Sequence, residues 1–308
     1  MKKQLLFLAV FLLCTPLLKA KDFSYQKQIL VTESASSPLA STCQAVYIAP
    51  NWLLTAAHCI TPAVSSAAHD LALNPQQDCN VRIVLAQEGE VVLSAAISCE
   101  EVHFPQEIVN KEGRKVLPFD LALLHYKDGS VPYEYYNATT GLPEEEDKSL
   151  RKKWKRSKPS QFLPLYTVKA KKEEQSPRVY PFTVANVEEG TASYVSFSAV
   201  PFFVGNTLED PSGAQATWGV RDFGVTHGES GGGVMLRLKD GSLGLLGIVS
   251  AATYRLATDG TDESEKFLFF TAFDEEVSLS FIEPFVSKDR IKPLLKAKPT
   301  KEPQIYSI

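Results

Sequence analysis

The chain carries, over residues 53–59, the run Leu53-Leu54-Thr55-Ala56-Ala57-His58-Cys59. Its apolar first half predicts a short buried strand, and the small alanines leave room for the imidazole of His58 to emerge where that strand ends. A neutral imidazole at such a position can serve as a general base. Since a histidine at a strand end is more often structural, this run predicts catalysis only in combination with other residues.

Two further stretches contain the residue types that acyl transfer by a serine requires. Residues 119–124 place an acid before an apolar run, Phe119-Asp120-Leu121-Ala122-Leu123-Leu124. Residues 228–233 surround a serine with glycines, Gly228-Glu229-Ser230-Gly231-Gly232-Gly233. A serine hydroxyl needs an imidazole to take its proton, and that imidazole needs a carboxylate to orient it. The developing oxyanion needs backbone N–H groups in a turn without bulky side chains.

In the order His, Asp, Ser, these stretches resemble the signatures of the chymotrypsin-like (trypsin-like, S1 family) serine peptidases. Those signatures read Thr-Ala-Ala-His-Cys, Asp-Ile-Ala-Leu and Gly-Asp-Ser-Gly-Gly. The resemblance covers roughly residues 41–126 and 190–285. It implies that Ser230 is the nucleophile, that His58 acts as general base and then acid, and that Asp120 orients the imidazole.

The resemblance also implies the residues around the nucleophile. The N–H groups of Gly228 and Ser230 would form the oxyanion hole. A strand would pair with the substrate backbone through Ser250, Ala251 and Ala252.

The specificity pocket and the activation step depart from trypsin. The pocket-base position, six residues before the nucleophile, holds Gly224, so a small-to-medium apolar side chain is expected there. Asp222 is the nearby acid that would change this expectation if the loop shifted by two residues. Glu229 stands where the family usually has Asp, and no Ile-Val-Gly-Gly start is present. We therefore do not expect trypsinogen-style activation.

Four cysteines follow the leader: Cys43, Cys59, Cys79 and Cys99. Residues 81–97 predict a hairpin centred on Gly89 that pairs Val81 with Ile97, Ile83 with Ala95 and Leu85 with Leu93. That hairpin sets Cys79 opposite Cys99 and leaves Cys43 to bond Cys59, closing a loop worth about 3 kcal/mol. Free buried thiols are the alternative.

The first twenty residues have the layout of a secretory signal peptide. Met1-Lys2-Lys3 is basic, residues 5–18 are almost wholly apolar, and Ala20 offers a small residue at the cut. We expect a secreted or periplasmic protein with no membrane span. Loss of the three leader lysines lowers the formal charge from −4 to −7, which argues against a nucleic-acid partner. The expected partner is a polypeptide substrate, and a monomer is the default.

Short strand-like runs between proline, glycine, asparagine and aspartate dominate the chain. Such spacing is typical of all-β proteins. Together with the resemblance it predicts two packed antiparallel six-stranded β-barrels. Only residues 280–295 look helical, and Pro284 and Pro293 restrict them to a short C-terminal helix.

The expected domain organisation follows changes in composition. It comprises a signal peptide (1–20), an N-terminal segment (21–40), a peptidase domain (41–290) and a C-terminal tail (291–308). The peptidase domain would contain a first barrel (about 41–127), charged inter-barrel loops (about 128–181) and a second barrel (about 182–280). The charged stretch has an acidic run at 144–147 and a basic run at 151–156, so long exposed loops are expected. The basic run could bind a polyanion or be a processing site, against the alternative of a solvated loop.

The sequence thus predicts a secreted serine endopeptidase that works through an acyl-enzyme. One alternative is a catalytically idle binding module with the same fold, and another is an esterase that uses the same triad. No metal or other cofactor is expected, because no residue set has metal-ligand spacing and no glycine loop fits a phosphate.

Overall fold

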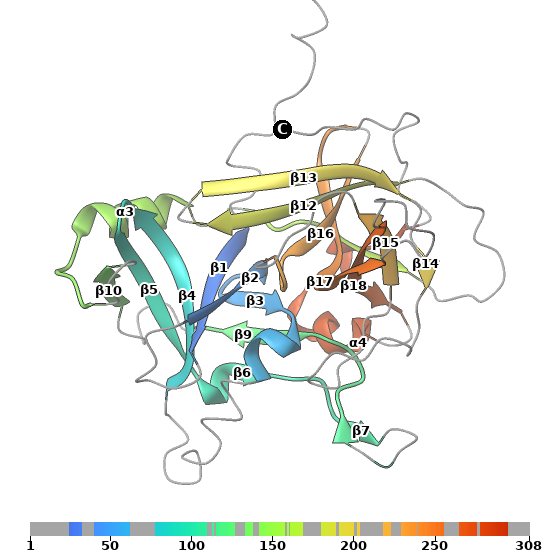
Figure 1. The fold of residues 1–308 in the computed structure, drawn as a ribbon, viewed down its shortest axis with the longest axis horizontal. Coiled ribbons are helices and arrows are strands. Elements are labelled where there is room, and N and C mark those ends of the chain that lie inside the picture. The colour runs from blue at the N-terminus through green and yellow to red at the C-terminus, as the bar shows by residue number, and fades with distance from the viewer. Residues whose placement is uncertain are drawn as a thin grey trace, which may run out of the picture.

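Two large curled sheets make up most of the computed structural model (Figure 1). The structure describes residues 25–32, 40–61, 78–109, 113, 115–126, 133–137, 142–157, 159, 161–168, 180–188, 191–199, 202–203, 218–222, 229–238, 240–255, 265–275 and 278–294. None of the helices in these segments is long and apolar enough to cross a membrane.

The first sheet has eight strands in the order β10-β5-β4-β1-β2-β3-β9-β6. Their bounds are β1 Gln26–Thr32, β2 Ala40–Ala49, β3 Trp52–Thr55, β4 Asp78–Glu88, β5 Val91–Ser98, β6 Val102–His103, β9 Ala122–His125 and β10 Tyr133–Asn137. The 3₁₀ turn η2 (Cys99–Glu101) joins β5 to β6. Residues 21–40, expected to be a separate N-terminal segment, thus supply β1, which pairs with both β2 and β4.

The β4–β5 hairpin confirms two of the three predicted pairs, Val81 with Ile97 and Ile83 with Ala95. The third pair is wrong, because Leu93 lies opposite Ala86 rather than Leu85. An irregularity between Val84 and Ala86 inserts one residue, as a β-bulge does. Gly89 then takes the first position of a two-residue turn with φ 58°. That position favours glycine in a hairpin.

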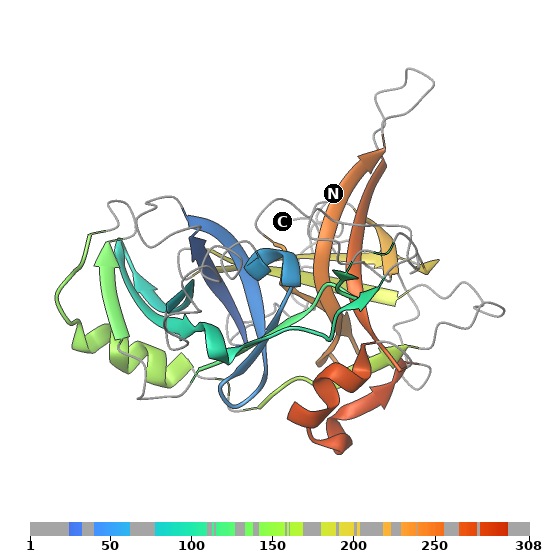
Figure 2. The ribbon, with the colours of Figure 1, turned by 90° about the horizontal axis from the view of Figure 1, so that it is seen from below.

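The second sheet has nine strands and follows the path β13-β12-β16-β17-β11-β18-β15-β14, with β19 paired to β11. The bounds are β11 Leu165–Val168, β12 Tyr180–Glu188, β13 Thr191–Ala199, β14 Phe202–Phe203, β15 Trp218–Asp222, β16 Gly233–Arg237, β17 Leu243–Arg255, β18 Glu265–Asp274 and β19 Ile291–Pro293. Figure 2 shows β17 and β18, in orange, as a long hairpin that projects beyond its neighbours.

The predicted all-β architecture with two packed sheets is confirmed, although the strand numbers are eight and nine instead of six each. Short strands that the resemblance does not imply, such as β10 and β19, account for the difference, and β11 runs parallel to its partners. A separate two-stranded sheet joins β7 (Ile108–Val109) to β8 (Lys115–Val116). The short C-terminal helix is also present as α4 (Leu279–Ile282), followed by the 3₁₀ turns η4 (Glu283–Phe285) and η5 (Lys288–Arg290).

The charged middle of the chain contains a helix, α3 (Lys148–Ser157), where exposed loops were expected. Leu150 and Trp154, one turn apart, are fully buried against the first sheet. Two apolar residues among six basic ones are too few to reveal a helical period in the sequence. Asp147 caps the helix by accepting a hydrogen bond from the Ser149 N–H at 2.7 Å, and that bond holds the pKa of the Asp147 carboxyl below its usual range.

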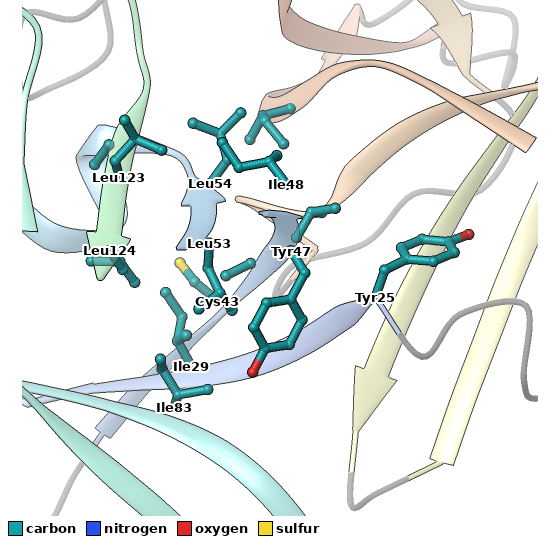
Figure 3. Close-up of a cluster of buried hydrophobic side chains, with 14 of the residues drawn as sticks. Tyr25, Ile29, Cys43, Tyr47, Ile48, Leu53, Leu54, Ile83, Leu123 and Leu124 are labelled. Carbon is teal, nitrogen blue, oxygen red and sulfur yellow. The ribbon is translucent and has the colours of Figure 1, made fainter. Parts of the chain in front are cut away.

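One apolar core joins the two sheets. Figure 3 shows part of it, where side chains from β1, β2, β3, β4 and β9 converge. The same cluster includes Met235 of β16 and Ile248 of β17 in the second sheet. The Tyr25 hydroxyl donates a hydrogen bond to the Met235 sulfur at 2.8 Å across the interface. This shared core fixes the two sheets relative to each other, so a site that draws residues from both can be preorganised.

Lys27 of β1 is buried beneath α3, with its Nζ 5.2 Å from the centre of the Trp154 ring. Burial lowers the pKa of Lys27 from 10.5 to about 8. Between these two values the unfolded chain binds more protons than the folded one, so this group makes stability rise with pH. Below about pH 8 the cost of burying the cation is present in full.

We therefore expect Lys27→Met to raise the free energy of unfolding at pH 7 by about 1–3 kcal/mol, after the loss of the cation–π contact is deducted. The gain should shrink as the pH rises from 8 to 10.5, because wild-type Lys27 becomes neutral in that window. Urea unfolding across this range measures it, with exposed Lys288→Met as the control. A gain that does not change with pH would contradict the burial argument.

Candidate active site

His58 and Asp120 come together because their strands are neighbours. Strand β3 pairs antiparallel with β9, and Thr55 lies opposite Ala122. His58 follows Thr55 by three residues, and Asp120 precedes Ala122 by two, so both stand at the same end of the pair. The chain turns helical over residues 57–61. This turn brings the imidazole back toward the carboxylate.

Both oxygens of Asp120 bind His58. The His58 backbone N–H donates to Oδ1 at 2.9 Å, and Nδ1 lies 2.8 Å from Oδ2. Because an ionised carboxylate only accepts hydrogen bonds, Nδ1 carries a proton in this contact and Nε2 is the basic nitrogen. The side chain of Asp120 is 0% exposed and that of His58 is 25% exposed, so the acid is sealed while the imidazole keeps access to solvent.

Ser250 of β17 completes the surroundings of Asp120. Its hydroxyl donates a short hydrogen bond to Oδ2, the oxygen that also binds the imidazole. Thr271 of β18 donates to the backbone carbonyl of Asp120 at 3.4 Å. The acid from the first sheet is therefore held partly by the second sheet. The sequence predicted Ser250 as a substrate-binding residue, and its bond to Asp120 was not foreseen.

Ser230 occupies a tight turn before β16. The Gly232 N–H donates to the Glu229 carbonyl at 2.9 Å, and Gly231 has φ 81° at the third position of this four-residue turn. A positive φ there is the signature of a type II turn and favours glycine. Ser230, at the second position, is half-buried, while its neighbours in the turn are buried. The turn thus directs one serine outward from a buried segment.

The turn rests on the strands that lead to His58. The Gln44 N–H of β2 donates to the Ser230 carbonyl at 2.7 Å, and the Thr55 hydroxyl donates to the Gln44 carbonyl at 2.7 Å. A Cβ on Gly231 would lie 2.1 Å from the Gln44 oxygen and 2.3 Å from the Thr55 hydroxyl. Ser230 and His58 are therefore positioned from the same pair of residues, although they lie in different parts of the chain.

Two buried glutamines reinforce this junction. The Gln44 side-chain amide donates to Asn186 Oδ1 at 2.8 Å, and its oxygen accepts from the Val187 N–H at 3.1 Å. Gln26 Nε2 donates to the Ala185 carbonyl, and its oxygen accepts from the N–H of the glycine at 233 at 3.3 Å. The sequence analysis missed both residues. An amide side chain inside an otherwise apolar strand was the available signal, and it does not reveal its partners.

The cysteine predictions are confirmed in part. Cys43 and Cys59 form a disulfide that ties β2 to the residue after His58. Cys99 is also disulfide-bonded, but the side chain of Cys79 lies outside the described residues, so their pairing stays a prediction. His58 and the sulfurs of Cys43 and Cys59 lie within 4.8 Å of one another. A disulfide offers no thiolate, so this group does not make a metal site.

The remaining predicted site residues have a partial description. Gly224 and Gly228 lie outside the described residues. Strand β16 ends opposite Ile248, so among the described strands residues 250–255 of β17 pair on one side only, with β18. Ala251 and Ala252 belong to this stretch. A strand with one unpaired edge can accept an extended peptide.

Replacement of Gly231 should test how tightly the turn is held. We expect Gly231→Ala to destabilise the protein by at least about 3 kcal/mol, because the new methyl group would overlap a backbone carbonyl and the backbone is strained for alanine. Gly241 is a matched control, since it has φ 83° and nothing within 4 Å of an added Cβ. Gly241→Ala should cost only about 1–2 kcal/mol. Equal losses in urea unfolding would show that Gly231 is not packed as described.

Comparison with known proteins identifies a family for the first half of the chain. The family model described as Trypsin matches residues 18–147, which include His58 and Asp120 and end before Ser230. No curated protein matches the chain.

Two solved structures are similar to this chain. One is the scabies mite inactivated protease paralogue S-I1, at 12% identity and a TM-score of 0.43, with 87% of this chain and 96% of that one covered. The other is described as HL collagenase, at 17% identity and a TM-score of 0.39, with 83% and 91% covered. At these TM-scores neither likeness bears on what this chain does.

The sequence motifs, the two curled β-sheets and the Trypsin match agree on one family. The expected recognition is confirmed by the match alone, which covers the first two motifs. The chain therefore contains a trypsin-family domain over residues 18–147 and has the chymotrypsin-like fold of the trypsin-like serine peptidases.

Proposed function

We propose that this protein is a serine endopeptidase that cleaves peptide bonds with Ser230, His58 and Asp120. The observation that carries the proposal is the pairing of a half-buried imidazole with a carboxylate that has no exposed surface. A buried acid bound to Nδ1 is the arrangement that keeps Nε2 basic and stabilises the imidazolium when it forms. The serine turn, anchored on the strand that leads to His58, supplies the third member.

The reaction would begin when Ser230 Oγ attacks the carbonyl carbon of the scissile bond. His58 Nε2 takes the hydroxyl proton, and Asp120 stabilises the resulting imidazolium. The tetrahedral intermediate collapses as His58 gives that proton to the leaving amine, and the acyl group stays on Ser230. A water molecule then attacks the ester, with His58 again as base, and the enzyme is regenerated.

The proposed oxyanion hole consists of the N–H groups of Gly228 and Ser230. The type II turn with Gly231 supports it, because the turn rigidly holds the backbone on the C-terminal side of the nucleophile. The substrate would extend along the unpaired edge of β17 near Ser250, Ala251 and Ala252.

A neutral specificity pocket follows from Gly224, and we expect cleavage after small-to-medium apolar residues. The rival acid, Asp222, is the last residue of β15 and lies opposite Lys266 in the sheet. Its backbone is therefore part of a regular strand, which disfavours a shift toward the pocket base.

We further propose that the protein is exported after removal of residues 1–20. The leader-like composition and the disulfide between Cys43 and Cys59 support this, because such bonds persist in oxidising compartments. The peptidase domain would extend from the N-terminal strand to about residue 290.

Each member of the proposed triad can be replaced singly. Ser230→Ala, His58→Ala and Asp120→Asn should each lower kcat for peptide hydrolysis by several orders of magnitude, because the three groups act as a unit. Exposed Ser287→Ala is the matched serine control and should keep full activity.

Reactivity toward a fluorophosphonate separates the proposed enzyme from its rivals. The wild type should be labelled and Ser230→Ala should not. A folded wild type that neither reacts nor cleaves would be an idle binding module, and one that hydrolyses esters but no peptide would be an esterase. Ser230→Ala with more than about a tenth of wild-type activity would rule out the assignment.

Ser250 should act as a positioning residue for Asp120. We expect Ser250→Ala to lower kcat by about tenfold or more with little change in KM, because a hydrogen bond to a charged group contributes about 1.5–3 kcal/mol. Ser242 also donates to an aspartate, Asp240, but at an exposed turn, so Ser242→Ala is the matched control. An unchanged kcat in Ser250→Ala would contradict this role.

A further inference from the structure

Helix α3 presents a row of four cations on its outer side: Lys148, Arg151, Lys152 and Lys155. Their spacing is i, i+3, i+4 and i+7, so they share one face of the helix. All four are exposed. We call this set the cationic row. It belongs to the basic run that the proposed function leaves unexplained.

The row is held in a fixed orientation by the opposite face of the helix. Leu150 and Trp154 are buried against the first sheet. Lys153 donates to the Gln87 carbonyl of β4 at 2.7 Å, and the Arg151 guanidinium lies 5.2 Å from the centre of the Tyr133 ring. A ligand would therefore meet positive charges in a preset arrangement, which lowers the entropic cost of binding.

The protein leaves most of the row without counter-charges. Arg151 lies 3.4 Å from Glu146, and Lys148, Lys152 and Lys155 have no ion pair among the described residues. Like charges at i and i+4 destabilise a helix, and a cation in the first turn opposes the helix dipole. The arrangement thus lowers helix stability, and a bound anion would remove that penalty.

The row lines a hollow of about 480 Å³, with Glu146 as the one acid in its wall. The hollow concentrates positive charge on a chain whose net charge is −4. Six of the chain's 32 basic residues stand within α3, which has no acid. Local charge of this kind attracts anions even when the whole molecule is acidic.

We propose that the cationic row is a docking site for an acidic segment of a polypeptide. The row spans about 10 Å along the helix, a length that three or four extended residues match. Exposed Glu144, Glu145 and Glu146 directly precede the helix and would repel a long, uniformly charged polysaccharide or a membrane surface. The apolar side of α3 is buried in the fold, so the helix has no face to insert into a bilayer.

The site is separate from the proposed catalytic residues. Helix α3 contacts β4 and β5, whereas His58, Asp120 and Ser250 lie on or beside β3, β9 and β17 (Figure 1). The inference does not require that Ser230 be a nucleophile. Binding can therefore be measured in a Ser230→Ala background, where the probe is not cleaved, and a negative result would leave the triad proposal untouched.

The test uses fluorescence anisotropy with a labelled octapeptide of alternating glutamate and glycine, and a glutamine–glycine peptide as the neutral probe. The protein should bind the acidic peptide, and binding should weaken with salt. The triple change Lys148→Gln, Lys152→Gln and Lys155→Gln should weaken it at least about tenfold. A triple change at exposed Lys115, Lys288 and Lys292 removes equal charge elsewhere and should have less than about a twofold effect.

Folding is a second readout, because the row variant should be as stable as the parent protein or more so. Equal affinity for the acidic and neutral peptides would overturn the proposal, and so would equal losses in the two triple variants. Heparin and phosphatidylserine vesicles form the comparison arms. If either binds through the row while the acidic peptide does not bind, the site is for that polyanion and the peptide proposal is wrong.

Discussion

A carboxylate that has lost all contact with water must find its hydrogen-bond donors in the protein, and Asp120 is in this position. It accepts from the backbone N–H of His58, from the His58 ring and from the hydroxyl of Ser250. The first two donors belong to the segment after β3 and the third to β17. Satisfying one buried acid thus requires that the two sheets meet in a single register.

The serine turn depends on the same meeting of sheets. Gly231 packs so closely on Gln44 and Thr55 that no side chain fits between them. The amides of Gln26 and Gln44 then join the first sheet to the edge of β12. Buried polar groups that are all satisfied add specificity to a packed interface, since any slip would leave several of them without partners. This junction suits a site whose geometry is set when the chain folds.

The sequence predicts local features better than contacts between distant segments. The motif residues, the Cys43–Cys59 bond and most of the β4–β5 register follow from short-range patterns and a family resemblance. The bulge near Leu85 could not be predicted, because it changes pairing without changing the hydrophobic alternation before it. Helix α3 was missed since only Leu150 and Trp154 mark its buried side.

The interlocked geometry of Asp120, His58 and the Ser230 turn has one chemical purpose in this account, which is to make Ser230 a nucleophile. Acid quenching during turnover of a slow ester substrate, followed by peptide mapping with mass spectrometry, locates the covalent intermediate directly. The account predicts one acyl group per chain, attached to Ser230, that appears in a rapid initial burst. An acyl group on another residue, or turnover with no covalent intermediate, would contradict it.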